Sequence, residues 1–122
     1  GCLVHVLALG FEHGHRALHL YNQGDAAVGV PLRADAVVDA IHAAGGLAIL
    51  AHPARYRLSH TLLIEAAALI GMDGGEAWYD YEMQGRWQPT AVVCESIDQH
   101  LKKLGLLRTC GTDTHGHDLK GR

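Results

Sequence analysis

The sequence has no excess of positive charge. Its 122 residues carry ten Lys and Arg against thirteen Asp and Glu, which gives a formal net charge of −3 at pH 7. A protein that binds the nucleic-acid backbone or an anionic membrane through charge needs a basic surplus on its surface. We therefore expect no strong binding to duplex nucleic acid and no electrostatic attachment to a membrane.

Long apolar runs and paired cysteines are also missing. The longest apolar stretches, such as Leu47–Ala51 and Leu62–Leu69, are far shorter than the roughly 20 residues of a membrane span, and no charged leader precedes an apolar signal core. The three cysteines, Cys2, Cys94 and Cys110, form no Cys-x-x-Cys motif and cannot all pair. We expect a soluble protein, without a membrane partner, in the reducing cytoplasm.

Histidine is the residue in excess, with ten in the chain. One of them stands in the segment from Cys110 to Gly116, where Asp113 and His115 are two residues apart, shortly after an apolar run. In extended backbone, side chains two residues apart point to the same face, so this pair can reach one cation together. The alternative is a turn-capping Asp beside a solvated His.

Apolar periodicity predicts four short strands that alternate with three helices. The predicted strands are Val4–Leu9, Leu47–Ala51, Gly75–Tyr79 and Leu106–Cys110, and the predicted helices are Ala34–Ala44, a helix from an N-cap at Ser59 to Gly71 that buries Leu62, Leu63, Ala66 and Ile70, and a helix from Pro89 to Gly105. Residues 11–31 look mostly like a connector, with a short helical turn at Arg16–Tyr21. This order predicts an α/β fold of one domain, with a parallel sheet or part of a barrel.

Two predicted strands lead to candidate metal ligands. One ends in His52, and the other is followed by Asp113 and His115. Because α/β folds gather their sites at the carboxyl ends of parallel strands, we expect these three side chains to lie close together. Arg55, three residues past His52, would lie on the same rim and could meet an anionic group.

Several histidines and one glutamate also fit ordinary structural roles. His52 could be a rim histidine satisfied by hydrogen bonds, and His5, inside an apolar strand, is by default a core histidine bonded to the backbone. The pair His13 and His15 lies in the connector and is typical of exposed loop histidines. Glu76 could be a ligand or a ligand's partner, although an exposed or hydrogen-bonded carboxylate is the simpler interpretation.

Four segments together resemble a known family. They are Val-His-Val-Leu at 4–7, Gly-Gly-Leu-Ala-Ile-Leu-Ala-His-Pro at 45–53, Gly-Glu-Ala-Trp-Tyr at 75–79 and Gly-Thr-Asp-Thr-His-Gly at 111–116. In this order they are similar to the PHP family (polymerase and histidinol phosphatase), and most of all to its stand-alone metal-dependent phosphoesterases. The resemblance implies a distorted (β/α)7 barrel with two or three divalent metal ions, such as zinc, manganese or iron, at one mouth.

The resemblance also implies residue roles. His5, His52, Asp113 and His115 match family metal ligands, a metal-activated water replaces any side-chain nucleophile, and the implied substrate is a phosphomonoester, a nucleotide or the end of a short oligonucleotide. Arg55 is a candidate phosphate contact from its position. Because His5 stands near the start of its strand, its presence at the metal mouth requires that strand to run against its neighbours.

About half of the family ligand set has no counterpart here. The initial His-x-His strand, the Asp and His of a second motif, and a Glu before the His5 strand are absent. We therefore expect residues 1–122 to be the C-terminal part of a single PHP-like domain and to be inactive alone. The alternatives are a non-catalytic PHP-like binding or scaffold domain and an amidohydrolase-type metal hydrolase that acts on C–N bonds.

Overall fold

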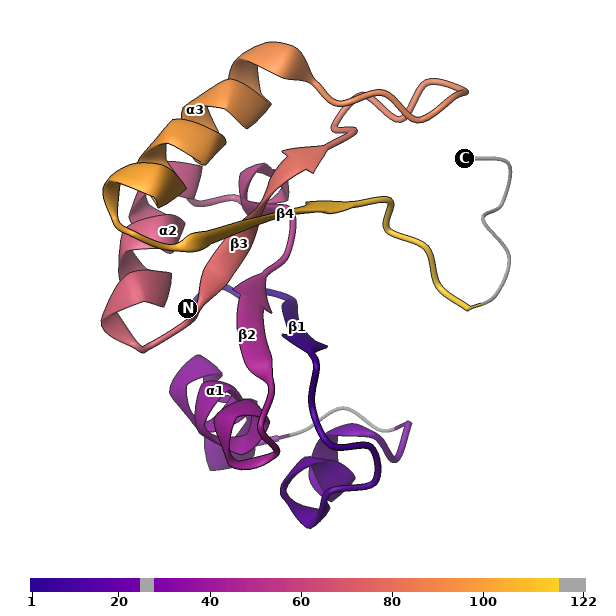
Figure 1. Ribbon diagram of the computed structural model, residues 1–122, viewed down its shortest axis with the longest axis vertical. Helices are drawn as coiled ribbons and strands as arrows, with labels where there is room; N and C mark the ends of the chain where they lie inside the picture. The colour runs from indigo at the N-terminus through magenta and orange to yellow at the C-terminus, as the bar shows by residue number, and fades with distance from the viewer. Residues whose placement is uncertain (25–27, 117–122) are drawn as a thin grey trace.

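The computed structural model describes residues 1–24 and 28–116 and shows an α/β fold (Figure 1). Residues 25–27 of the predicted connector lie outside the described ranges. The strands are β1 (Val6–Leu9), β2 (Leu47–Leu50), β3 (Gly74–Tyr79) and β4 (Leu107–Gly111); the α-helices are α1 (Ala34–Ala43), α2 (His60–Leu69) and α3 (Ala91–Lys103); the 3₁₀ helices are η1 (Arg16–Tyr21), η2 (Val30–Leu32) and η3 (Pro53–Arg55).

The four strands form one sheet in the order β1-β2-β3-β4. β2, β3 and β4 are parallel, whereas β1 pairs with β2 in the antiparallel direction, with Val6 opposite Leu50. The predicted α/β fold with four strands alternating with helices is confirmed, and it is consistent with part of a barrel. The reversed direction of the first strand is confirmed as well.

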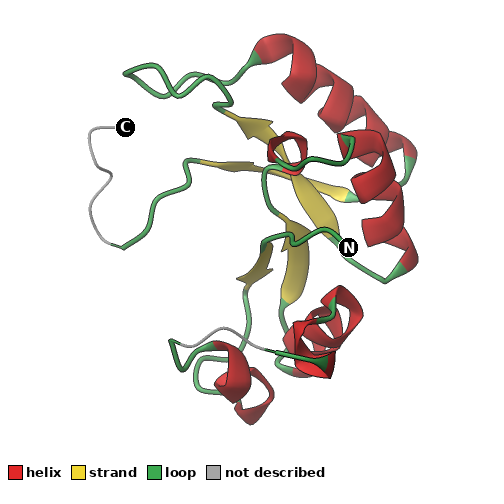
Figure 2. Ribbon diagram, turned by 180° about the vertical axis from the view of Figure 1, so that it is seen from behind, coloured by secondary structure: helices red, strands yellow, loops and turns green. Residues whose placement is uncertain are grey.

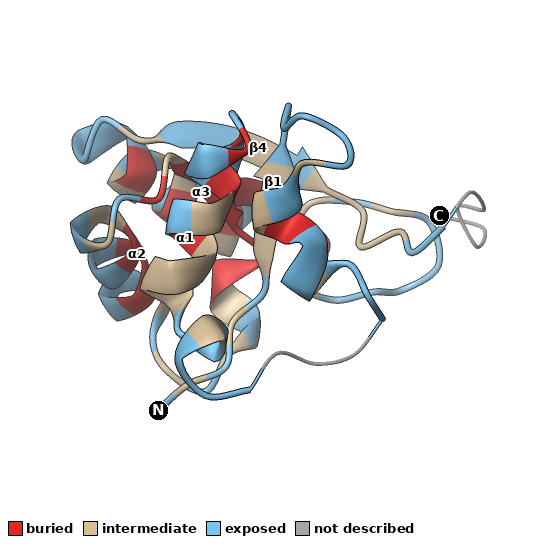
Figure 3. Cartoon of the chain, turned by 90° about the horizontal axis from the view of Figure 1, so that it is seen from below, coloured by how far each residue is buried: buried red, intermediate tan, exposed pale blue. Residues whose placement is uncertain are grey.

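The three α-helices lie on one side of the sheet (Figures 1 and 2). Buried positions concentrate where these helices meet the strands, while the loops beyond the strand ends are mostly exposed (Figure 3). The core on this side includes Val38 and Ile41 of α1, Ile64 of α2, and Ile97 and Leu101 of α3. Burial of such aliphatic side chains is the main force that holds helices against a sheet.

Helix α2 begins and ends as its sequence predicts, but buries a different face. The Ser59 hydroxyl accepts a hydrogen bond from the Leu62 N–H at 3.3 Å, which caps the helix. The buried side chains of α2 are Leu63, Ile64 and Ala67, whereas the predicted Leu62 is 53% exposed. The helix is apolar on several sides, so its periodicity could not select the stripe that faces the sheet.

Asp73 joins three elements at the end of the sheet where β3 begins. Its Oδ2 atom accepts a hydrogen bond from the Ala48 N–H of β2 at 2.8 Å and lies 2.7 Å from Nε2 of His42 in α1. Burial acts to raise the pKa of Asp73, but the Ala48 N–H and His42 outweigh it, and the pKa lies below its usual value of 3.8. The ionised carboxylate therefore stabilises the folded state.

Asp73→Asn is expected to lower the free energy of unfolding by about 1 kcal/mol near neutral pH. Because the folded-state pKa is lowered, this stabilisation is fully present above the unfolded value of 3.8 and is lost as the pH falls through the folded value. Urea unfolding over a pH series checks both points. Asp39→Asn, at an exposed position of α1, is the matched control and should change stability only slightly. An Asp73→Asn deficit that persists unchanged in acid would contradict the assignment.

Candidate metal site

A pocket of about 460 Å³ lies where β2 and β4 end and β1 begins. Because β1 runs against β2, its first residues meet the carboxyl ends of the other strands. The pocket is lined by His5, Leu7, Ala51, His52, Glu76 and the segment Cys110–His115. The structure therefore brings all four predicted ligands, His5, His52, Asp113 and His115, to one pocket, together with Glu76.

His52 occupies an unusual backbone conformation at the end of β2. Its φ and ψ angles are 27° and 65°, in a region that side chains other than glycine rarely adopt. Its N–H donates a hydrogen bond to Oε2 of Glu76 at 2.7 Å, and Pro53 then begins η3. Strain of this kind costs about 1–3 kcal/mol and persists only where the surroundings fix it. Here a buried hydrogen bond supplies part of that constraint.

The His52 ring is buried and retains one unpaired nitrogen. The residue is only 4% exposed, and its Nδ1 atom has no hydrogen-bond partner among residues 1–24 and 28–116. Burial, followed by the positive charge of Arg55, lowers the pKa of His52. The ring is therefore held neutral, and neutral imidazole is the form that binds metal ions. The His5 ring stands edge-on to it, with 5.2 Å between the ring centroids.

Glu76 is a buried carboxylate whose place depends on Gly111. The residue is 5% exposed, and burial raises its pKa, although the hydrogen bond from the His52 N–H acts in the opposite direction. A Cβ atom at Gly111 would overlap the Glu76 carboxylate, so the absence of a side chain there makes room for it. From the sequence, an exposed or hydrogen-bonded carboxylate was the simpler interpretation of Glu76. Gly111, at the end of the facing strand, was the signal that a buried side chain needs space there.

Arg55, Tyr79 and Asp113 form a hydrogen-bonded group beside the pocket, and Asp113 also lines it. Arg55 Nη1 donates to Oδ2 of Asp113 at 2.9 Å and to the Tyr79 hydroxyl at 3.0 Å, and that hydroxyl lies 3.2 Å from the same carboxylate oxygen. Burial acts to raise the pKa of Asp113, but the Tyr79 hydroxyl and Arg55 lower it overall. Tyr79 was not among the predicted site residues. The available signal was its position as the last residue of β3, at the carboxyl end of a parallel strand.

Asp113 and His115 are not arranged as the sequence suggested. β4 ends at Gly111, and Asp113 has a φ of 57°, so the two side chains are not presented by an extended strand. His115 Nδ1 lies 2.9 Å from the backbone oxygen of Asp113 and 3.9 Å from its Oδ1. Aspartate tolerates this left-handed conformation better than most residues, and the resulting turn replaces the predicted alternation.

The donor types of this pocket suit divalent cations. Neutral imidazoles and carboxylates bind zinc, manganese and iron, and the unpaired Nδ1 of buried His52 is available. Within residues 1–24 and 28–116, no three His, Cys, Asp or Glu side chains already stand close enough to form a metal-binding group. The residues therefore fit a cation site by chemistry, and a complete coordination shell needs either side-chain movement or further ligands.

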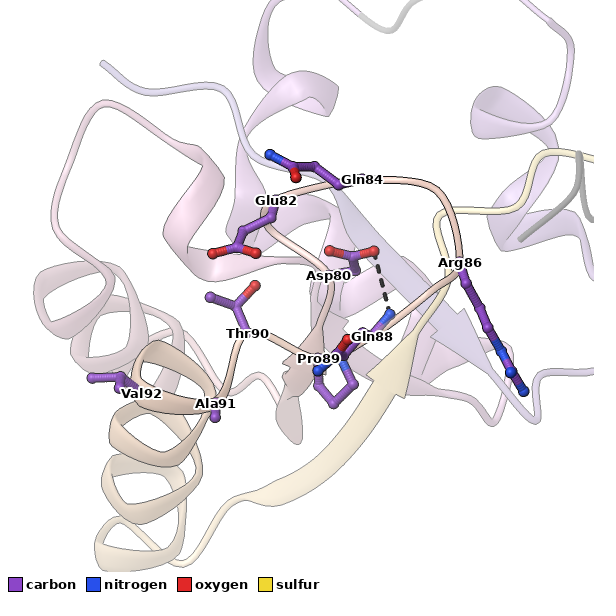
Figure 4. Close-up of a pocket in the computed structure, with 9 residues that line it drawn as sticks. All are labelled: Asp80, Glu82, Gln84, Arg86, Gln88, Pro89, Thr90, Ala91 and Val92. Carbon is purple, nitrogen blue, oxygen red and sulfur yellow. Dashed lines mark hydrogen bonds between the residues drawn. The ribbon is translucent and has the colours of Figure 1, made fainter.

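A second pocket, of about 590 Å³, lies beside the N-terminus of α3 and is lined by residues of the loop after β3 (Figure 4). The buried Asp80 accepts hydrogen bonds from the N–H groups of Met83 at 2.9 Å and Gln88 at 3.4 Å. Arg86 points away from the other labelled side chains in this view. The Asp80 carboxylate therefore serves to shape the loop that leads into α3.

Gly111→Ala is expected to cost about 1–3 kcal/mol of stability, because the new methyl group overlaps the Glu76 carboxylate. Glu76→Ala removes the carboxylate that the new methyl group overlaps. Adding Gly111→Ala to a Glu76→Ala chain should therefore cost much less stability than adding it to the unaltered chain. Chemical unfolding of the two single variants and the double variant measures this difference. Equal costs in both backgrounds would show that the Gly111 effect does not involve Glu76.

Comparison with known proteins gives a limited likeness to hydrolases. No family model and no curated protein matches the chain. An amidohydrolase from Chromobacterium violaceum, whose structure holds sulfate and no metal, is 26% identical over 66% of this chain and 27% of its own, with a TM-score of 0.54. A "putative metal-dependent phosphoesterase" from Bifidobacterium adolescentis is 33% identical over 67% of this chain and 28% of its own, with a TM-score of 0.48.

The chain thus spans little more than a quarter of the length of either protein. No helix among the described residues is long and apolar enough to cross a membrane. Membership of the PHP family stays a prediction from the sequence motifs. The α/β sheet and the likeness to the Chromobacterium violaceum protein give the chain a fold similar to part of a hydrolase.

Proposed function

We propose that this chain belongs to a metal-dependent hydrolase that cleaves a phosphoric ester. The observation that carries the proposal is the meeting of His5, His52, Asp113 and His115 at one pocket, from three separate parts of the chain. Residues 1–122 would form the C-terminal part of a single PHP-like domain, and a preceding segment would supply the remaining ligands of a site for two or three cations.

The proposed roles follow from the chemistry of each side chain. His5, His52, Asp113 and His115 would hold zinc, manganese or iron, and Glu76 is close enough to the pocket to assist them. Bound divalent cations would activate a water molecule and offset the charge that develops on the phosphoryl oxygens. The attacking group is then a water, and no side chain of this chain is assigned as a nucleophile.

Arg55 supports a phosphorylated substrate. Its side chain is 42% exposed and is held by Tyr79 and by Asp113, which lines the pocket. A guanidinium group at this place matches an anionic phosphoryl group through paired charge-assisted hydrogen bonds. The sulfate in the Chromobacterium violaceum structure is also a tetrahedral oxyanion. We infer a phosphomonoester, a nucleotide or a short oligonucleotide end as the substrate class, in a cytoplasmic protein.

A second candidate is hydrolysis of a C–N bond, because the similar Chromobacterium violaceum protein is described as an amidohydrolase. A neutral amide offers no dianionic group to Arg55, so this guanidinium favours the phosphoric ester. A non-catalytic PHP-like domain is the third candidate. Retention of four donor residues at one pocket argues against it, since a scaffold has no need of them.

The longer protein that contains this chain is expected to bind divalent metal and to hydrolyse a generic phosphomonoester. His52→Ala and Asp113→Ala should each lower this activity by about 100-fold or more, because each removes a ligand side chain. Metal analysis and a phosphate-release assay, run beside a panel of amide substrates, provide the measurement. His19→Ala, at an exposed position of η1, should leave both properties unchanged.

If His52→Ala and Asp113→Ala keep both metal binding and phosphate release, the metal site is excluded. Amide cleavage without phosphate release would instead support the amidohydrolase candidate. Stoichiometric metal binding without hydrolysis of either substrate class would favour the non-catalytic domain.

Arg55→Gln is expected to raise the KM for a phosphomonoester by about tenfold, because a charge-assisted hydrogen bond to the substrate is lost. Arg55 also holds Asp113, so Tyr79→Phe serves as the comparison: it removes the other Asp113 partner and keeps the guanidinium. Steady-state kinetics and metal titration separate the two effects. If both variants weaken metal binding alike and neither changes KM, Arg55 acts on Asp113 and not on the substrate.

A further inference from the structure

The backbone of His5 is hydrogen-bonded to the side chain of Tyr56, which lies 51 positions further along the sequence. His5 precedes β1 and is itself exposed. Its N–H donates a hydrogen bond of 2.8 Å to the hydroxyl of Tyr56, just after η3. The same hydroxyl donates to the backbone oxygen of Ala51 at 3.1 Å. Tyr56 therefore connects the residue before β1 to the residue after β2.

This connection continues the β1–β2 ladder by means of a side chain. The pairing of Val6 with Leu50 places His5 opposite Ala51. In an antiparallel hydrogen-bonded pair, the two residues exchange two N–H to oxygen bonds. One of these is direct, from the Ala51 N–H to the His5 oxygen at 3.0 Å. The Tyr56 hydroxyl takes the place of the second, because it accepts from His5 and donates to Ala51.

The Tyr56 ring also contacts the two candidate ligands of the pocket. Its centroid lies 5.4 Å from that of His52 and 6.5 Å from that of His5, and the His5 and Tyr56 rings are nearly perpendicular at 84°. The His5–Tyr56 contact is edge-to-face and the His52–Tyr56 contact is tilted, and ring contacts at such distances favour defined orientations. Tyr56 thus acts on His5 through both the backbone and the imidazole.

The Tyr56 hydroxyl has the hydrogen-bonding capacity for this role. A phenol carries one O–H donor and accepts through its oxygen, so it donates to Ala51 while it accepts from His5.

We propose that Tyr56 is a positioning residue: its hydroxyl holds His5 beside His52 at the pocket and thereby sets the affinity of these histidines for a divalent cation. The inference rests on the proposed function, since it assumes that the pocket binds a cation. It adds a residue that contacts no metal itself. Partners of metal-binding histidines typically contribute about 10–100-fold to metal affinity.

Tyr56→Phe tests the proposal, because it keeps the ring and removes the hydroxyl. Zn²⁺ affinity, measured by competition with a chromogenic chelator, should fall by about tenfold. The same substitution in a His5→Ala chain should cause no further loss, since the positioned ligand is gone. Tyr21→Phe is the matched control: it removes a hydroxyl that donates to the Pro31 oxygen at 2.9 Å in the connector, and it should leave Zn²⁺ affinity unchanged.

Amide hydrogen exchange tests the geometry directly, both in the unaltered chain and in Tyr56→Phe. Amide hydrogen exchange at His5 should be slow, although His5 lies outside β1, and should become fast in Tyr56→Phe. Fast exchange at His5 in the unaltered chain would overturn the proposal. Unchanged Zn²⁺ affinity in Tyr56→Phe would overturn it while leaving the proposed function intact. Absence of Zn²⁺ binding by the longer, unaltered protein would overturn both.

Discussion

The hydrogen bond from the His52 N–H to the Glu76 carboxylate is the interaction on which this end of the molecule depends. It joins the backbone just beyond the end of β2 to a side chain within β3, the neighbouring parallel strand, and both residues are at most 5% exposed. The bond supports the left-handed backbone of His52 and thereby directs the chain into η3. Glu76 can occupy its place only because Gly111, on the next strand, has no side chain. Three strands are thus coupled at one point.

The reversed direction of β1 gives the pocket its remaining side. A parallel first strand would carry His5 to the opposite end of the sheet, away from His52. In the observed antiparallel arrangement the two imidazoles are in contact, and the Tyr56 hydroxyl closes the pair of strands beyond the last residue of the ladder. Asp113, which also lines the pocket, is held by Arg55 and by the Tyr79 hydroxyl, and the Tyr79 ring lies 5.3 Å from the His52 ring. The pocket therefore combines a His52 nitrogen that has no partner among the described residues with an Asp113 carboxylate that is already paired.

Local features of the fold were predictable because they depend on neighbouring residues. The Ser59 cap, the glycine after α2 and the alternation of apolar runs with helical stripes need only a few adjacent positions to take effect. Strand boundaries shifted by one or two residues, as for β1, which begins at Val6 and not Val4. The face of α2 that is buried could not be predicted, because packing against the sheet selects between two apolar stripes.

The sequence by itself determined the order of elements, the α/β class and the residues that gather at the strand ends. Tertiary structure decided how those residues meet. The turn at Asp113 replaced an extended strand, Glu76 proved to be buried and bonded 24 residues away, and Tyr56 reached His5 across 51 residues. The physical reason is that periodicity and capping act within one element. Hydrogen bonds between distant residues and the conformations they support exist only once packing has brought the strands together.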